Sequence, residues 1–439
     1  MSGALNGAVV RKFAHYMTSR LGMEQIRGIS AYALGPALGI LSGPILARAL
    51  GPEGRGQFAS VMQPITVAGA VASLGFPAAV AYFIASGGNS DRVYRRALAT
   101  AAIPALLTYA AMCWYAGIVS HRQGISFTVI CIAWSAIVLS AVVQIRRAYW
   151  QGQGRWRKLD AERAAYAVTR FGIVVLLALL GVVLAEAYVA ASLLAFVAAA
   201  LLLFTKGSPS RSESLPTSGE IVRYSVLASI GTIAAVASSR LDQILMPAAA
   251  SSAELGYYAV AVTVAEVPLV LATLSARNAL QLAAVGDSNI EIFRKTRVYI
   301  VVCIGLIAAL FVAAPYGTVL VFGPDFATSA SSIQLLSIAG VASLVSLVCG
   351  SILAGRGRPA LASFVSLVSL LVTVLGFFMF WDSMSSLMAA RISLISLVSS
   401  AVVGVGAILK VTQPRPARQE GAGHRQGASK ELAVEGNTE

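Results

Sequence analysis

Four arginines lie inside apolar segments of this chain, where a charged side chain is costly, and one of them, Arg277, is near the end of its segment and can snorkel easily. Arg170, Arg240 and Arg391 are roughly 9, 12 and 10 Å from the nearer end of their segments, at ~1.5 Å per helical residue. An arginine at the centre of a membrane span costs ~2.5–3.5 kcal/mol unless it has a partner or a watery cavity, or can snorkel. In a cavity, the guanidinium groups would bind anionic oxygens through paired hydrogen bonds. Snorkelling or a structural ion pair is the alternative for each of them.

Carboxylates are rarer still in these segments. Glu266 lies roughly 16 Å into its segment, and Asp242 is two residues from Arg240. A buried acid is stable when it is protonated or paired, so both residues are candidates for proton or sodium coupling. For Glu266, an ion pair with an arginine of a neighbouring helix is the alternative. Because two positions are ~200° apart on a helix, Arg240 and Asp242 should each have a different partner.

Several kinds of enzyme chemistry have no sequence signature here. No lysine follows a glycine, so the chain lacks a Walker A loop. The three histidines, His15, His121 and His424, lie outside the apolar segments, and no HExxH motif occurs. The four cysteines are isolated, without the spacing of a metal site. We therefore predict no catalytic residues, no metal and no cofactor, apart from a coupling proton or sodium ion.

The composition identifies the elements that must position these residues. Of 439 residues, 57% are hydrophobic and only 12% are charged, which excludes a soluble protein of this size. Apolar stretches long enough to span a bilayer indicate an all-α integral membrane protein. We predict 12 transmembrane helices in two bundles of six, near residues 28–50, 58–84, 95–118, 125–147, 164–184 and 187–204, and near 222–248, 255–284, 298–321, 329–354, 359–381 and 384–409.

These stretches divide the chain into five parts. We expect a cytoplasmic N-terminal segment (1–27), a first bundle (28–204), a cytoplasmic linker (205–221), a second bundle (222–410) and a disordered cytoplasmic tail (411–439). Of the 33 lysines and arginines, 26 fall on the connections that share a side with the termini, and three (Arg48, Arg55 and Arg122) fall on the other side. The positive-inside rule therefore places both termini in the cytoplasm. The net charge of +14 records this orientation and implies no nucleic-acid partner.

Short glycine motifs recur in the two halves of the chain. GRGQFA at 54–59 corresponds to ELGYYA at 254–259, and GQGR at 152–155 corresponds to GRGR at 355–358, so the offsets are 200 and 203 residues. Halves with an even number of helices enter the membrane from the same side. We therefore predict a parallel pseudo-repeat around a central cavity that rocking exposes to either face.

Two segments resemble a known family. LARALGPEGRGQFA at 46–59 resembles the start of the Wzx-like polysaccharide flippases of the multidrug/oligosaccharidyl-lipid/polysaccharide exporter superfamily. RLDQIL at 240–245, followed by ELGYYAVA at 254–261, is similar to that family's seventh and eighth helices. The resemblance covers the whole plan of two six-helix bundles.

The resemblance implies a function. Such a protein flips polyprenyl-pyrophosphate-linked oligosaccharide to the outer leaflet of the bacterial cytoplasmic membrane by alternating access, for polysaccharide biosynthesis. A glycan polymerase and glycosyltransferases are its expected partners, besides the lipid bilayer. The family also implies a cationic cavity, for which Arg170, Arg240, Arg391 and Arg48 are the candidate pyrophosphate and glycan ligands.

Two other functions fit parts of the pattern. A cation-coupled multidrug exporter has the same bundle plan, but its cavity should be acidic or apolar. A membrane glycan polymerase would need a sizeable extramembrane loop with catalytic residues. The predicted outer loops hold about ten residues or fewer, which disfavours the polymerase.

Overall fold

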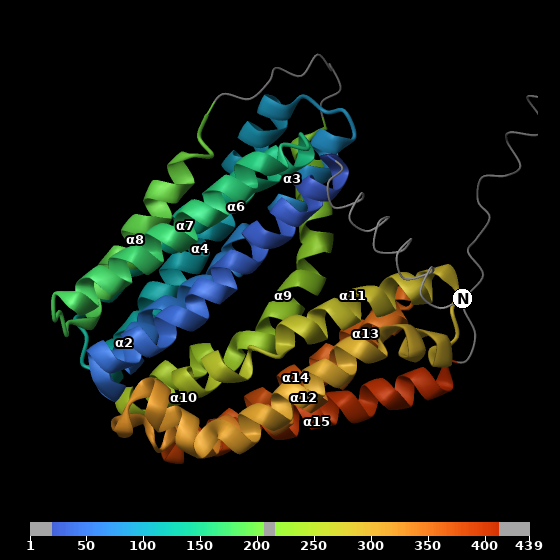
Figure 1. Cartoon of the computed structure of the whole chain (residues 1–439). Helices are drawn as coiled ribbons and strands as arrows, with labels where there is room; N and C mark the ends of the chain where they lie inside the picture. Colours follow the sequence, from blue (N-terminus) through green and yellow to red (C-terminus); the bar gives the residue numbers. More distant parts are fainter. Residues whose placement is uncertain (1–19, 206–215, 412–439) are drawn as a thin grey trace, which may run out of the picture.

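The computed structural model describes residues 20–205 and 216–411, and every regular element in these ranges is a helix (Figure 1). For residues 20–33 and several positions between 230 and 239, only the helical backbone is described. The all-α prediction is thereby confirmed. Most of the predicted N-terminal segment, linker and C-terminal tail lies outside the described residues.

The first group of helices, called the N-terminal bundle here, contains a sharp reversal at Gly51. This glycine has φ 65° and ψ −179°, outside the helical range, and α2 turns back on itself there (Figure 1). A residue without Cβ adopts such a positive φ at little cost. The bundle comprises α2 (Arg20–Ser73), α3 (Phe76–Ala85), α4 (Ser90–Gln123), α5 (Phe127–Trp134), α6 (Ala136–Gly152), α7 (Trp156–Leu179) and α8 (Ala185–Leu201).

The second group, the C-terminal bundle, has capped helices and one broken span. The hydroxyls of Ser251, Ser288 and Ser385 accept hydrogen bonds from backbone N–H groups in the first turns of the helices that follow them. Helices α10 and α11 are bent by 49° at the short break before Leu269. The bundle comprises α9 (Ser218–Ala249), α10 (Ser252–Ala265), α11 (Leu269–Val285), α12 (Asn289–Phe322), α13 (Ser329–Gly355), α14 (Pro359–Met379) and α15 (Ser386–Lys410), with short turns η1 (Pro324–Phe326) and η2 (Trp381–Ser383).

Many of these helices can cross a membrane. Seven described helices are long and apolar enough, or eight if α10 and α11 form one span. Large apolar side chains such as Leu179, Tyr316 and Phe378 are more than 80% exposed, as on a lipid-facing surface. Each of the twelve predicted stretches lies on described helices, but this count does not confirm twelve crossings. The run 34–73 counts once although Gly51 breaks it, and α3 and α8 have only 10 and 17 residues.

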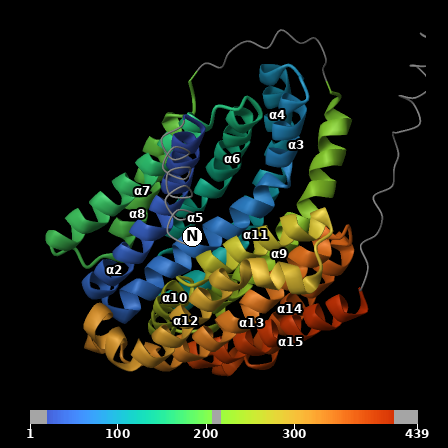
Figure 2. The same cartoon turned by 45° about the vertical axis from the view of Figure 1, so that its right-hand side comes forward.

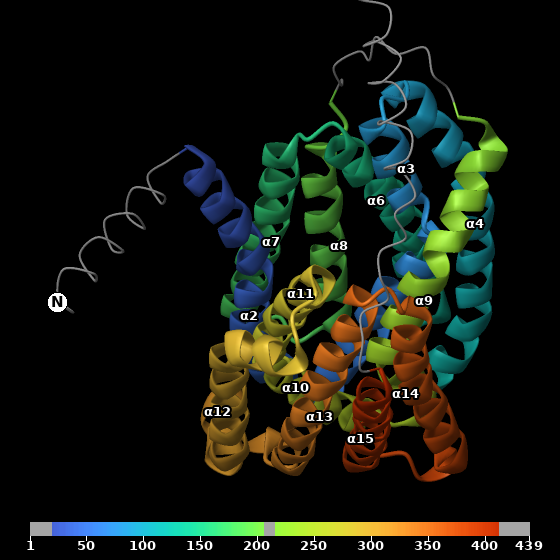
Figure 3. The ribbon, with the colours of Figure 1, turned by 90° about the vertical axis from the view of Figure 1, so that its right-hand side faces the viewer.

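The two bundles meet at one end and separate towards the other, as Figures 1 and 3 show. Helix α9 crosses between them and packs against α2, α3 and α4 (Figure 2). Near its start, the ring of Tyr224 stacks on that of Tyr82 with centroids 4.9 Å apart. We call the end where α2 meets α10 the joined end, and the opposite end the separated end.

Glycines bring the bundles together at the joined end. A Cβ on Gly56 would lie 1.8 Å from the carbonyl oxygen of Ser252, and a Cβ on Gly256 would lie 2.0 Å from that of Pro52. The contact is therefore reciprocal, and both residue pairs are offset by 200 positions. Only glycine allows the two backbones to come so close.

A second pair of glycines occupies matching places in the two bundles. A Cβ on Gly152 would lie 2.8 Å from Ile84 Cβ of α3, and one on Gly355 would lie 2.9 Å from Ala283 Cβ of α11. In both halves, the end of the fourth predicted span thus packs on the end of the second. The following turns also agree, since Gly154 and Gly357 have φ 68° and 72°.

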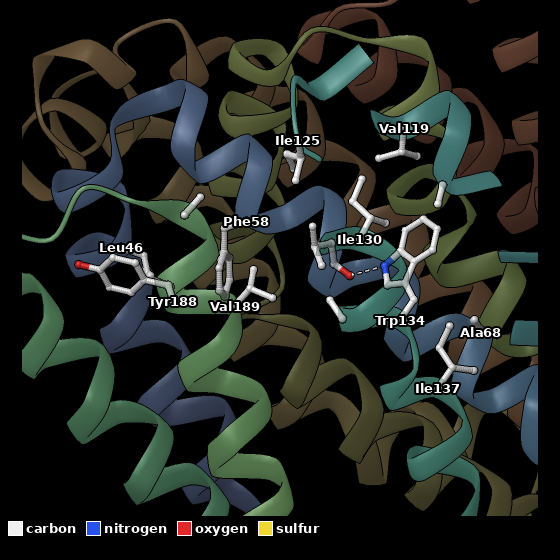
Figure 4. Close-up of a cluster of buried hydrophobic side chains, with 14 of the residues drawn as sticks. Leu46, Phe58, Ala68, Val119, Ile125, Ile130, Trp134, Ile137, Tyr188 and Val189 are labelled. Atoms are coloured by element: carbon white, nitrogen blue, oxygen red, sulfur yellow. Dashed lines mark hydrogen bonds between the residues drawn. The ribbon is translucent and has the colours of Figure 1, made fainter. Parts of the chain in front are cut away.

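The core of the N-terminal bundle combines apolar packing with satisfied polar atoms (Figure 4). Leu46, Phe58 and Tyr188 are nearly fully buried there. The buried indole of Trp134 donates its Nε1 hydrogen to the carbonyl oxygen of Val61 at 2.9 Å. This bond ties α5 to the second half of α2.

Candidate functional site

A cavity of about 400 Å³ lies between the first half of α2 and α7 in the N-terminal bundle. Gly35, Pro36 and Gly39 keep the α2 wall free of bulky side chains, and the opposite wall is basic and aromatic. The residues that line it are Gly35, Pro36, Leu38, Gly39, Ser42, Arg147, Arg163, Tyr166, Ala167, Arg170 and Phe171. Three arginines and no carboxylate are among these described lining residues, so the lining itself attracts anions.

Helix α7 supplies most of the charged wall. Arg163, Tyr166 and Arg170 are spaced three and four positions apart, which places them on one face of the helix. Of the residues predicted to bind substrate, Arg170 is the one in this cavity. Its Nε is buried and has no hydrogen-bond partner among the described residues.

Arg147 reaches the cavity from α6 and is held by a buried acid. Its Nε and Nη2 donate to the two carboxylate oxygens of Glu162 at 3.0 and 2.7 Å. The Glu162 side chain is fully buried, whereas that of Arg147 is 30% exposed. This two-point pairing fixes the guanidinium plane and leaves its free edge available to a ligand.

A second polar group lies in the C-terminal bundle, at the break between α10 and α11. Arg240 of α9 forms an ion pair with Glu266, and both side chains remain more than one-third exposed. The same guanidinium lies 3.4 Å from Gln243 Oε1. Glu266 directly follows α10 and precedes Pro268, so the bend presents its carboxylate to α9. Glu266 is therefore paired with an arginine of a neighbouring helix in this structure, and its candidacy for ion coupling stays a prediction.

Asp242 has a separate set of partners. Its carboxylate accepts a hydrogen bond from the Tyr258 hydroxyl, which lies 3.1 Å from Ser393 Oγ of α15. The prediction that Arg240 and Asp242 have different partners is thus confirmed. Together the two acids connect α9 to α10 and α15.

Arg48 lies elsewhere, at the joined end. Its Nε donates to the carbonyl oxygen of Val321 at 3.0 Å, and its Nη2 donates to that of Leu320. These carbonyls end α12, where a positive charge is favourable. Arg48 thereby links the N-terminal bundle to the C-terminal bundle, and it lines a smaller cavity of about 300 Å³ beside Asp325.

Arg391 is not among the residues that line either cavity. Its side chain is exposed and makes no hydrogen bond or ion pair with the described part of the chain. It continues a stripe on α15 that includes Ile395, Val398 and Val402, which are 59%, 43% and 67% exposed. The structure thus brings Arg240 and Glu266 together, but groups neither Arg391 nor Arg48 with Arg170.

Sequence reasoning missed two cavity residues, Arg147 and Arg163. Both count among the residues of a cytoplasmic connection, because Arg147 is the last residue of the apolar stretch 125–147 and Arg163 directly precedes the stretch 164–184. The helices extend beyond the apolar stretches and carry both arginines into the cavity wall. The three-and-four spacing of Arg163, Tyr166 and Arg170 was the available signal.

Solved structures with this fold are membrane transporters. A multidrug resistance MATE family transporter of the MOP superfamily, in its inward-facing conformation, matches with a TM-score of 0.67 at 14% identity, over 87% of this chain and 97% of that one. The lipid II flippase MurJ, in an inward closed conformation, matches with a TM-score of 0.67 at 9% identity, over 88% of this chain and 87% of that one. A MOP superfamily transporter from Pyrococcus furiosus, described as having a binding pocket of reverse polarity, matches with a TM-score of 0.50 at 15% identity, over 88% and 94%. The chain is therefore a multi-pass membrane protein with the fold of MOP superfamily transporters.

A family match in the sequence classifies the chain more narrowly than the fold does. The family described as polysaccharide biosynthesis protein matches residues 28–281, more than half of the 439 residues. The chain belongs to this family, which confirms the resemblance found at residues 46–59 and 240–261. Among curated proteins, none matches the chain. The structural neighbours named here are transporters and a flippase rather than enzymes, which disfavours the polymerase alternative.

Proposed function

We propose that this protein flips polyprenyl-pyrophosphate-linked oligosaccharide from the inner to the outer leaflet of a bacterial cytoplasmic membrane by alternating access. The observation that carries the proposal is the cavity between α2 and α7, with Arg147, Arg163 and Arg170 in its wall. A pyrophosphate has several anionic oxygens, and guanidinium groups bind them bidentately without losing their charge. The cavity volume of about 400 Å³ suits a headgroup rather than a whole oligosaccharide.

The distribution of basic residues supports a cavity that faces the cytoplasm. Arginines and lysines gather at the separated end. They lie in the first turns of α4 and α12, around the turn that joins α6 to α7, and in the turn that joins α13 to α14: Arg92, Arg95, Arg96, Arg155, Arg157, Lys158, Arg294, Lys295, Arg297, Arg356 and Arg358. Among the described residues, Arg48 and Arg122 lie at the joined end. By the positive-inside rule the separated end is cytoplasmic, as are both termini.

The reciprocal glycine contact supports rocking of two related halves. The contact of Gly56 with Ser252 and the contact of Gly256 with Pro52 are related by one offset of 200 residues. Such a pair of contacts is expected on a pseudo-two-fold axis along the membrane normal. A contact on this axis lets each bundle tilt equally against the other. We infer that opening here, with closure at the separated end, exposes the headgroup to the outside.

The Arg240–Glu266 pair supports a way to couple this cycle to an ion. A phosphate that competes for Arg240 would release Glu266, and a released carboxylate in a membrane interior takes up a proton or binds sodium. Asp242 is the second coupling candidate, through Tyr258. An inside-negative potential also favours outward movement of anions by ~2.3 kcal/mol per charge per 100 mV.

A reconstituted flipping assay tests the proposal. Purified full-length protein is placed in vesicles with a lipid-linked oligosaccharide, and the outward-facing glycan is measured with an impermeant glycosidase. Arg163→Ala and Arg170→Ala should each slow flipping at least tenfold, while Arg223→Ala, an exposed arginine at the start of α9, should match the wild type. Wild-type rates in both cavity variants would contradict the proposed headgroup site.

One alternative, a cation-coupled multidrug exporter, is favoured by the two carboxylates Asp242 and Glu266 in the C-terminal bundle. Two observations count against this alternative: both carboxylates already have hydrogen-bonding partners, and the cavity in the N-terminal bundle is basic. Efflux of cationic dyes by cells that express the chain, abolished by Glu266→Gln, would support this alternative over flipping.

A further inference from the structure

The cavity between α2 and α7 has more apolar lining than a pyrophosphate alone would need. Beside the three arginines, its walls include four apolar side chains: Pro36, Leu38, Ala167 and Phe171. A pyrophosphate is covered by anionic oxygens, and each of these is stable only against a hydrogen-bond donor or water. The apolar part of the lining therefore indicates that a second, less polar group of the ligand also enters the cavity.

Tyr166 lies between two of the arginines on the charged wall. It is three positions after Arg163 and four positions before Arg170, and all three residues line the cavity from one face of α7. At ~1.5 Å per residue, the two arginines begin about 10.5 Å apart along the helix axis, with the half-buried Tyr166 ring between them. A group joined to a phosphate on either guanidinium can therefore reach this ring.

The Tyr166 ring is held in one orientation by α8 and faces a wall without bulky side chains. The Phe196 ring packs against it edge to face, with centroids 6.0 Å apart and an interplanar angle of 83°. Aromatic pairs favour this geometry because the positive edge of one ring meets the negative face of the other. On the α2 wall, a Cβ added to Gly35 or Gly39 would meet no described atom within 4 Å. The cavity therefore offers a fixed aromatic ring with open space opposite.

We propose that Tyr166 binds the first sugar of the lipid-linked oligosaccharide, the one joined directly to the pyrophosphate, by stacking on one face of the sugar ring. This inference rests on the proposed function, because it assigns the neighbouring part of the same ligand to the same cavity. A pyranose carries hydroxyls at its rim and C–H groups on its faces, and these C–H groups match the negative face of a tyrosine ring. A volume of about 400 Å³ lies within the range of sites for small organic ligands. Tyr166 thereby lets the cavity select the glycosylated lipid over the bare polyprenyl pyrophosphate.

Binding measurements on the purified full-length protein in detergent test the proposal. The two ligands are polyprenyl pyrophosphate and the same lipid with one glucose on its pyrophosphate. The wild type should bind the glucosylated lipid roughly three- to tenfold more tightly, which is the gain expected from one aromatic contact. Tyr166→Leu should remove this difference without changing the Kd for the sugar-free lipid. Tyr166→Phe, which keeps an aromatic ring, should retain the difference.

Two further variants separate sugar binding from phosphate binding and from general effects. Arg163→Ala should weaken the binding of both lipids by the same factor, because its guanidinium would contact the phosphates that they share. Tyr316→Leu removes an 86% exposed tyrosine that is not among the cavity-lining residues, and it should leave both Kd values unchanged. If Tyr166→Leu fails to fold, the wild-type comparison still decides, because it needs no variant.

Three results would overturn the proposal. These are equal wild-type affinities for the two lipids, an undiminished preference for the glucosylated lipid in Tyr166→Leu, or equal weakening of both lipids in Tyr166→Leu. The last result would reduce Tyr166 to a residue that orients the wall of α7. In each case, binding of the sugar-free lipid that is weakened by Arg163→Ala would leave the proposed function intact. Absence of binding by both lipids would overturn the proposed function together with this inference.

Discussion

Gly256→Ala should weaken the joined end of the molecule. The new Cβ would lie 2.0 Å from the Pro52 carbonyl oxygen and 2.9 Å from its carbon, whereas ordinary contacts begin near 3.4 Å. Pro52 and Gly256 must therefore move apart by about 1 Å or more, and overpacking of this kind costs ~1–3 kcal/mol. If a conformation in which the joined end is open is free of this clash, the population of that conformation relative to the closed one rises about 5- to 150-fold.

Cysteine accessibility measures this shift. Ser252→Cys reports on the joined end, in a background where the four native cysteines are replaced, with a membrane-impermeant maleimide added to intact cells. Gly256→Ala should raise the labelling rate at least fivefold. Gly305→Ala is the matched control, since no atom lies within 4 Å of its added Cβ. Equal labelling rates in Gly256→Ala and the control would refute the reasoning that this glycine contact holds the end closed.

Further predictions concern buried pairs and coupling. Glu162→Gln should lower the free energy of unfolding in detergent by about 3 kcal/mol, because it leaves Arg147 without its carboxylate; a loss below 1 kcal/mol would contradict a structural pair. Glu266→Gln should make flipping insensitive to an imposed proton or sodium gradient, and retained stimulation would exclude this residue as the coupling site. Trp134→Phe should cost about 1 kcal/mol of stability, since Val61 loses its donor; an unchanged denaturant midpoint would argue against that hydrogen bond.

The class of fold could be predicted from the sequence because bilayer insertion demands long apolar helices. Partners across helices could be predicted only in part. The 200° separation of Arg240 and Asp242 correctly indicated separate partners, but the ion pair with Glu266 depends on how α10 bends before Pro268. Apolarity does not report such a bend.

The arginines show the limits of reading a membrane protein by loop counting. Arg55, Arg147 and Arg163 were counted as connection residues, yet Arg55 is buried and the other two line the cavity. Arg48, a predicted substrate ligand, instead binds the last carbonyls of α12. A sequence position near a turn fixes the depth of a residue in the membrane. The direction in which its side chain points depends on how the helices pack.

A structure of the full chain with bound polyprenyl-pyrophosphate-linked oligosaccharide would test the central claim most directly. We predict that phosphate oxygens lie within hydrogen-bonding distance of the Arg163 and Arg170 guanidiniums, with Arg147 still paired to Glu162. Phosphates bound in the C-terminal bundle, with the cavity between α2 and α7 unchanged, would contradict it.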